Sequence, residues 1–260
     1  MLFEKKYDLV FGIGQACACT QNLRKNKLQF SSYPYDWLFG MKLLDRVKLI
    51  TENYAHFIDF EDLQDTKRDN KSEKNLCEIY FNTRNGICFN HDFEYGKPLD
   101  ETYPAVKKKY DRRIERQLEQ IEKSKKILVV YLQSPCDREE ITDEILVEAQ
   151  NILKNRFSKQ EFTLLYLFCD HDKKDYELRE ISENVARIDF DYDAYSEDAP
   201  FSVNEDILVK VFYNVKITNK FVTVRNFWRR FFYRLKYLRK NYKIKRFVLQ
   251  YTKQTGSYKT

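Results

Sequence analysis

The chain has 260 residues, which is long enough for one large domain or for one domain with an appended segment. Its 43% hydrophobic content, with only 6 Gly and 5 Pro, excludes a largely disordered chain. The net charge of +6 is unevenly distributed, because residues 207–260 contain 15 Lys and Arg and no Asp or Glu, whereas residues 1–206 are net acidic.

The cysteines and the apolar runs indicate a cytoplasmic protein. The opening residues mix acidic and basic side chains and lack the apolar run of a secretory signal. The longest apolar runs, residues 127–132 and 162–169, are far shorter than the ~20 residues that span a bilayer. None of the 6 Cys forms a Cys-x-x-Cys pair or has the Cys/His spacing of a zinc site. We therefore expect reduced thiols, no metal and no cofactor.

In chain order, the first predicted element is a buried strand at residues 7–11, closed by Gly12 and Gly14. An apolar periodic stretch at residues 37–49 predicts a helix. The highly charged residues 61–75 predict a solvated loop or a weak helix.

The second half of the chain alternates between strand and helix patterns. A strand at residues 86–93 carries His91 and precedes a long helix that starts near Pro104. The alternation that follows is a strand at 127–133, a helix at 139–156, a strand at 162–169, a helix at 175–184 and a strand at 186–190. This order is typical of βαβ units. It predicts an α/β fold with a central, mostly parallel sheet and helices on both faces.

The basic extension, residues 207–260, predicts an amphipathic helix over residues 223–243 beyond the α/β domain of residues 1–206. Its large aromatic and basic side chains include Trp228, Arg229, Arg230, Phe231 and Phe232. Such a helix suits an anionic membrane surface, which would place the protein at the inner face of the membrane. Docking on the acidic body is an alternative, and nucleic-acid binding is favoured less.

Cys17 is the strongest candidate for a catalytic residue, because it lies where the first strand passes into a helix. A helix N-terminus stabilises a thiolate and offers free N–H groups. The N–H groups near Gly12 and Gly14, or the amide of Gln15, could hold an oxyanion. The alternative is a buried structural cysteine.

A cysteine hydrolase also needs a base, for which the chain offers three histidines. His91 is the best candidate, because it ends a predicted strand among small and polar neighbours. Asp92 could orient the imidazole, although adjacent residues of a strand point to opposite faces. Asp36 or Asp170 could serve instead, although for Asp36 the favoured role is the N-cap of a helix from Trp37 onward.

The same turn permits a second interpretation. Residues 12–17 approximate a Gly-x-Gly-x-x-Gly loop after a first strand, which cradles a pyrophosphate at a helix N-terminus. Cys17 replaces the third glycine. A nucleotide-linked sugar is the ligand that this interpretation predicts.

Three segments carry a resemblance to a known family: GIGQACACT at residues 12–20, SSYPYDWLF at 31–39 and FNHDF at 89–93. Over residues 7–135 the chain resembles a bacterial family of papain-like cysteine peptidases, with Gly12 and Tyr35 where that family has Ser and Phe. The resemblance implies Cys17 as nucleophile and His91 as base, with Asp36 shaping the site. It also implies a papain-like α+β fold, whereas the strand and helix periodicity favours a parallel sheet.

Three functions follow from these patterns. The first is a cysteine peptidase, or a related hydrolase or acyl transferase, acting on a peptide, acyl or glycan substrate through Cys17 and His91. The second is a membrane-peripheral enzyme or accessory factor of cell-surface polysaccharide biosynthesis. The third is a binding protein without catalysis, in which both residues are structural.

Overall fold

The computed structural model describes residues 2–14, 16–72, 75–133, 139–191, 205–218 and 220–222. Two compact units divide the chain, Met1–Lys220 and Phe221–Thr260. The predicted amphipathic helix at residues 223–243 falls outside the described residues. No described helix is both long enough and apolar enough to cross a membrane.

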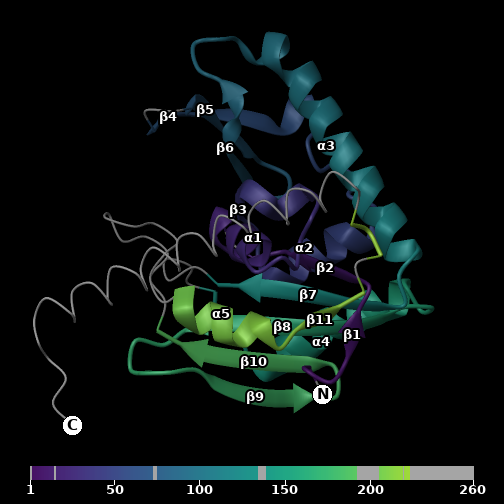
Figure 1. Ribbon diagram of the computed structural model, residues 1–260. Coiled ribbons are helices and arrows are strands. Elements are labelled where there is room, and N and C mark those ends of the chain that lie inside the picture. The colour runs from purple at the N-terminus through teal and green to yellow at the C-terminus, as the bar shows by residue number, and fades with distance from the viewer. Residues whose placement is uncertain are drawn as a thin grey trace, which may run out of the picture. The chain divides into compact units, whose positions relative to one another are not determined.

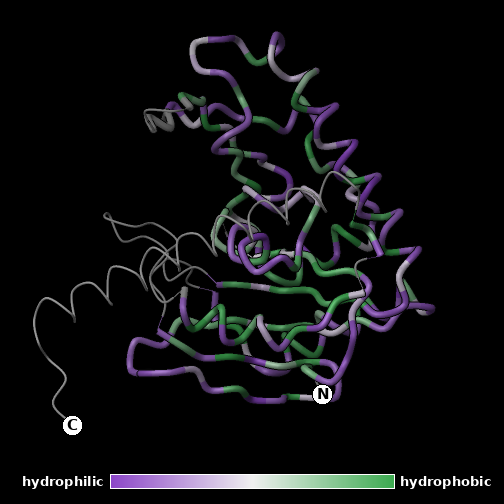
Figure 2. Tube along the Cα trace, in the orientation of Figure 1, coloured by the Kyte–Doolittle hydropathy of each residue, from purple (hydrophilic) through white to green (hydrophobic). Residues whose placement is uncertain are grey.

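The first unit is built on a five-stranded sheet with the strand order β2-β7-β8-β10-β9 (Figure 1). Its strands are β2 (Leu9–Gly12), β7 (Lys126–Leu132), β8 (Glu161–Cys169), β10 (Val185–Phe190) and β9 (Glu177–Ser182). The first four run parallel, and β9 pairs antiparallel at the edge. Strands β7 and β8 are almost continuously apolar, as Figure 2 shows, because both of their faces are buried.

Helices cover both faces of this sheet. On one face, α1 (Ala16–Lys25) and α5 (Glu205–Tyr213) share a hydrophobic cluster with β7, β8 and β10. The opposite face of β8 contacts α4 (Asp143–Arg156), which also packs against α2 (Leu43–Thr51). Figure 1 shows α5 in front of the sheet and α4 behind it. The predicted α/β fold is therefore confirmed.

A second, antiparallel sheet has the order β3-β6-β5-β4. Its strands are β3 (Leu38–Gly40), β6 (Ile87–Glu94), β5 (Asn75–Asn82) and β4 (Leu63–Ser72). The long helix α3 (Leu99–Glu122) packs on β6 through aromatic contacts, with the rings of Phe89 and Tyr110 5.4 Å apart and edge to face. The remaining elements are β1 (Lys6–Tyr7), η1 (Pro34–Trp37), η2 (Phe60–Asp62) and β11 (Lys216–Ile217).

Three sequence predictions of local structure are wrong. The helix expected at 175–184 is β9, whose backbone pairs with β10 in a hairpin. The helix expected at 37–49 is interrupted at Gly40 and Met41, which have φ angles of 76° and 60°, so that β3 precedes α2. Residues 61–75 contain the strand β4, because its backbone pairs with β5 despite the high charge of its sequence.

The boundary between the two units also differs from the predicted boundary at residue 206. Helix α5 buries Leu208 and Val211 in the hydrophobic cluster, and β11 pairs with β1. Residues 207–220 therefore belong to the first unit, although their sequence has the basic character of the extension.

Candidate active site

Cys17 lies in the first turn of α1, directly after β2, and its side chain is only 7% exposed. The preceding glycines allow α1 to approach β7 closely. A Cβ atom on Gly14 would lie 2.5 Å from the backbone nitrogen of Leu132, and one on Gly12 would lie 2.8 Å from the Cys19 sulfur. Close approach, and not a left-handed backbone, is therefore what requires glycine here.

The backbone N–H groups of this turn are partly committed. The Gly12 N–H donates to the side-chain oxygen of Gln29 at 3.2 Å, so it cannot serve as the oxyanion donor that the sequence suggested. The Ile13 N–H donates to the Val130 carbonyl at 2.9 Å. Gln15 lies outside the described residues, so its proposed amide role stays a prediction.

The fully buried Arg46 of α2 holds the turn before Cys17 through hydrogen bonds. Its Nη1 donates to the carbonyls of Ile13 and Gly14 at 2.9 and 3.2 Å. Its Nε donates to the carbonyls of Gly40 and Met41 at 3.1 and 3.3 Å. One planar guanidinium therefore joins the Cys17 turn to the loop between β3 and α2.

Burial raises the pKa of the Cys17 thiol to about 11, although a hydrogen bond from the backbone N–H of the same residue lowers this pKa. The position of Cys17 at a helix N-terminus predicted a stabilised thiolate. Desolvation outweighs that effect, because the ionised form of a nearly inaccessible sulfur loses its hydration. The unliganded protein therefore holds Cys17 as a neutral thiol.

His91 lies on β6 with an exposed side chain, and its pKa is lowered by partial burial, against the opposing charge of Asp92. Asp92 is buried against α3, where its carboxylate pairs with Lys109 and accepts the Tyr110 hydroxyl at 2.8 Å. Asp92 therefore ties β6 to α3. The pairing of Cys17 with His91 remains a prediction.

The elements that carry Cys17 and His91 are linked through β3. Helix α1 contacts β3, and β3 pairs with β6 so that Leu38 lies opposite Phe89, two positions before His91. Cys17 and His91 therefore lie on two elements, α1 and β6, that both contact the short strand β3.

Asp36 is a fully buried centre of hydrogen bonds. Its carboxylate accepts from Thr20 at 3.0 Å, Arg24 at 2.9 Å, Gln29 at 2.8 Å and the Tyr33 backbone at 3.0 Å. Burial raises its pKa, and the positive charge of Arg24 opposes that shift. This carboxylate joins α1 to η1 and closes a capping box at the start of η1. Asp36 therefore acts as a structural tie. The N-cap of η1 is Tyr33 and Asp36 occupies its third position, so the expectation that Asp36 itself caps a helix starting at Trp37 is wrong.

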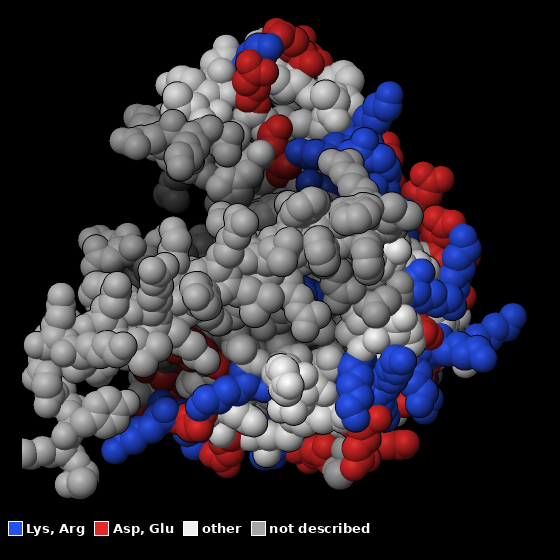
Figure 3. Space-filling view, viewed as in Figure 1, with Lys and Arg blue, Asp and Glu red and all other residues white. Residues whose placement is uncertain are grey.

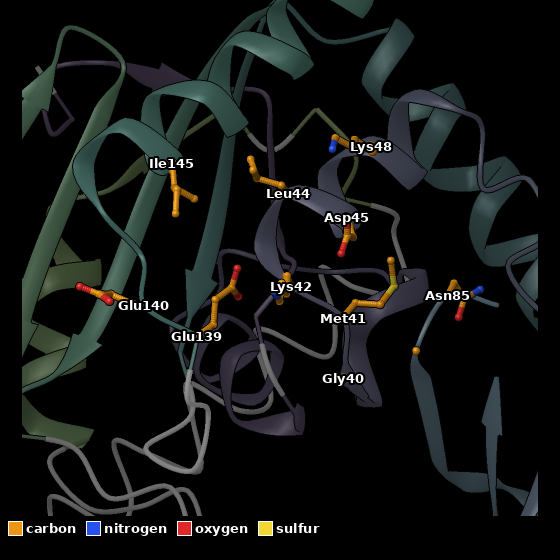
Figure 4. Close-up of a pocket in the computed structure, with 11 residues that line it drawn as sticks. Gly40, Met41, Lys42, Leu44, Asp45, Lys48, Asn85, Glu139, Glu140 and Ile145 are labelled. Atoms are coloured by element: carbon orange, nitrogen blue, oxygen red, sulfur yellow. The ribbon is translucent and has the colours of Figure 1, made fainter. Parts of the chain in front are cut away.

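A groove of about 880 Å³ lies beside the loop between β3 and α2 (Figure 4). Its lining residues are Gly40, Met41, Lys42, Leu44, Asp45, Lys48, Asn85, Gly86, Glu139, Glu140 and Ile145. The Glu139 carboxylate accepts the backbone N–H of Leu43 at 3.0 Å, at the start of α2. The groove thus combines apolar and charged side chains of both signs next to the loop that Arg46 joins to the Cys17 turn.

Acidic and basic side chains are mixed on the surface of the first unit. In Figure 3, acidic and basic residues alternate over the described part of the face shown. The proposed polyanion contacts Trp228, Arg229, Arg230, Phe231 and Phe232 lie outside the described residues, so the membrane hypothesis stays a prediction.

Comparison with known proteins bears on the Cys17 turn directly. Residues 8–172 match the family described as "Putative papain-like cysteine peptidase (DUF1796)". This match covers more than half of the chain. The chain belongs to this family. The matched residues include Cys17, Asp36 and His91.

One viral protein is also similar. "Uncharacterized protein R408" of Acanthamoeba polyphaga mimivirus is 22% identical over 176 residues, which cover 63% of this chain and 78% of the viral protein. No solved structure matches the chain. The match over residues 8–172 establishes membership of the matched family, whereas the bacterial source that the resemblance implied stays an expectation.

The structure also brings together residues that the sequence analysis missed. Cys169, His171 and Asp191 place one ligand atom each within 4.8 Å of one another at the carboxyl ends of β8 and β10. The Cys-x-His spacing was visible in the sequence. Asp191 follows the next parallel strand, however, so only the strand order reveals that it lies beside them.

Proposed function

We propose that this member of the papain-like cysteine peptidase family is a cysteine-dependent hydrolase or acyl transferase, with Cys17 as nucleophile and His91 as general base. The observation that carries the proposal is the position of Cys17 at the first turn of α1, within the residues that match the family. Papain-like chemistry needs a thiol and an imidazole, and both candidates lie inside the matched range.

The protonation states favour a mechanism that starts from a neutral pair. The Cys17 thiol, with a pKa of about 11, is protonated near neutral pH, and the lowered pKa of His91 keeps its imidazole neutral there. A neutral imidazole can accept a proton, which a protonated one cannot. The proposed enzyme therefore uses general-base catalysis and does not hold a permanent thiolate–imidazolium pair.

In the first step, the Cys17 sulfur attacks the substrate carbonyl while its proton passes to His91. The bond to the leaving group breaks, and the imidazolium returns the proton to that group. The product is a thioester on Cys17. Water, or the hydroxyl or amine of an acceptor, then attacks the thioester with His91 again taking the proton, and the thiol is restored. The step requires His91 to reach hydrogen-bond distance of the sulfur in the substrate complex.

Hydrolysis of p-nitrophenyl acetate tests the role of His91. We expect His91→Ala to lower the acylation rate by about 10²–10⁴-fold, because the thiol then has no base. Since the pKa of His91 is lowered, the wild-type rate should stay level below the ordinary histidine pKa of about 6.5 and fall only at lower pH, where the imidazole is protonated.

His56→Ala is the matched control, because His56 is also exposed and bonds to Asp59 at 2.5 Å. This variant should keep the wild-type rate. Equal rates for wild type and His91→Ala would contradict the proposed base.

A further inference from the structure

Three potential metal ligands converge at the carboxyl edge of the parallel sheet. Cys169 ends β8, His171 follows it in a turn, and Asp191 follows β10. Residues Phe190 and Cys169 are register partners, which fixes the two strand ends side by side. The His171 Nδ1 lies 2.9 Å from the Asp191 carboxylate, and the Cys169 sulfur lies 3.8 Å from Nε2.

The position of the sulfur does not suit a second catalytic dyad. Cys169 Sγ is 4.0 Å from His171 Nδ1 and 3.8 Å from Nε2, so it is almost equally distant from both nitrogens. A thiol that donates along the lone pair of one ring nitrogen would be much farther from the other. The sulfur therefore lies off the axis that proton transfer to the imidazole requires.

The spacing instead suits ligands around one ion. Metal–ligand distances of about 2.0–2.3 Å in a tetrahedral zinc site place neighbouring ligand atoms about 3.3–3.6 Å apart. At His171 Nδ1, the separations of 2.9 Å to the Asp191 carboxylate and 4.0 Å to the Cys169 sulfur lie on either side of that range. The His171 side chain is exposed and free to rotate about its own bonds, whereas Cys169 packs against the hydrophobic cluster.

We propose that Cys169, His171 and Asp191 bind a divalent transition metal ion of the zinc class. Thiolate, imidazole and carboxylate together are a donor set that favours zinc over calcium or magnesium. Binding releases the Cys169 proton to solvent, and three protein ligands leave a coordination position open for water or a substrate atom.

The electrostatic surroundings favour a cation. Asp170 precedes His171 and Asp172 follows it in the turn. These two carboxylates add negative charge beside the three ligands, which increases the local concentration of cations. The site is also at the carboxyl edge of parallel strands, where α/β proteins commonly bind ligands.

This proposal is independent of the cysteine hydrolase chemistry, because neither Cys17 nor His91 belongs to the cluster. Cobalt(II) is a suitable probe, since a cobalt–thiolate bond gives a charge-transfer band that carboxylate and imidazole ligands do not give. The full-length protein is titrated with Co²⁺ under reducing conditions, and Zn²⁺ is then added to displace it.

We expect one Co²⁺ per chain, with the thiolate band present and displaced by Zn²⁺. Cys169→Ser should abolish the band, and His171→Ala should raise the dissociation constant at least tenfold. Cys88→Ser should keep the thiolate band and the Co²⁺ affinity of wild type, because Cys88 does not belong to the cluster. The proposal is overturned if wild type binds no Co²⁺, or if Cys169→Ser keeps the band and the affinity of wild type.

Discussion

Replacing Asp36 with alanine is expected to lower the free energy of unfolding by about 3–5 kcal/mol, because buried donors left without an acceptor cost about 1–3 kcal/mol each. The change removes the acceptor of four hydrogen bonds at once. Thr20 and Gln29 are almost completely buried, so water cannot replace the carboxylate. Urea unfolding followed by circular dichroism measures the loss.

Two variants control this experiment. Asp36→Asn keeps an acceptor oxygen for Thr20 and Gln29, so its cost should be smaller than that of Asp36→Ala. Asp175→Ala removes an exposed carboxylate whose pair with Lys210 spans 3.2 Å, with both side chains more than half exposed. Such an exposed pair is screened by solvent and contributes little to stability. A loss from Asp36→Ala no larger than that from Asp175→Ala would contradict the structural role assigned to Asp36.

Replacing Arg46 with methionine is expected to cost about 2–4 kcal/mol. Methionine fills a similar volume and removes a buried charge, which is favourable in itself. It leaves the carbonyls of Ile13, Gly14, Gly40 and Met41 without their guanidinium donor, however, and that loss dominates. The same unfolding measurement gives the magnitude.

Arg46→Lys provides a second readout if the methionine variant does not fold. Lysine keeps the charge but cannot bridge both loops with one planar group. We expect faster alkylation of Cys17 in this variant, because the turn that buries it is released, while Cys169 reacts at its wild-type rate. Unchanged protection of Cys17 would show that Arg46 does not hold the turn.

The parallel sheet was predictable because its strands are short, almost continuous apolar runs. Strands β7, β8 and β10 are close to the predicted ranges, and β7 and β8 bury both faces. Strand β4 and edge strand β9 were missed, because their charged sequences reveal neither an apolar face nor the backbone pairing that forms them. Tertiary pairing decides such segments.

For the candidate site, the sequence predicted where the Cys17 turn lies but not the pKa of the Cys17 thiol. The glycines and the following helix place Cys17 correctly at the start of α1. The raised pKa depends on how deeply the packed protein buries the sulfur, which one segment of sequence does not encode. Arg46 and the cluster around Cys169 were missed for a related reason, since their partners are distant in sequence.

The most direct test of the central claim is to locate the covalent intermediate. The protein is incubated with p-nitrophenyl acetate, quenched in acid and mapped by peptide mass spectrometry. We predict an acetyl group on Cys17, with the adduct absent in Cys17→Ser and formed far more slowly in His91→Ala. Acetylation of another residue at the wild-type rate, with Cys17 unmodified, would contradict the claim that Cys17 is the nucleophile.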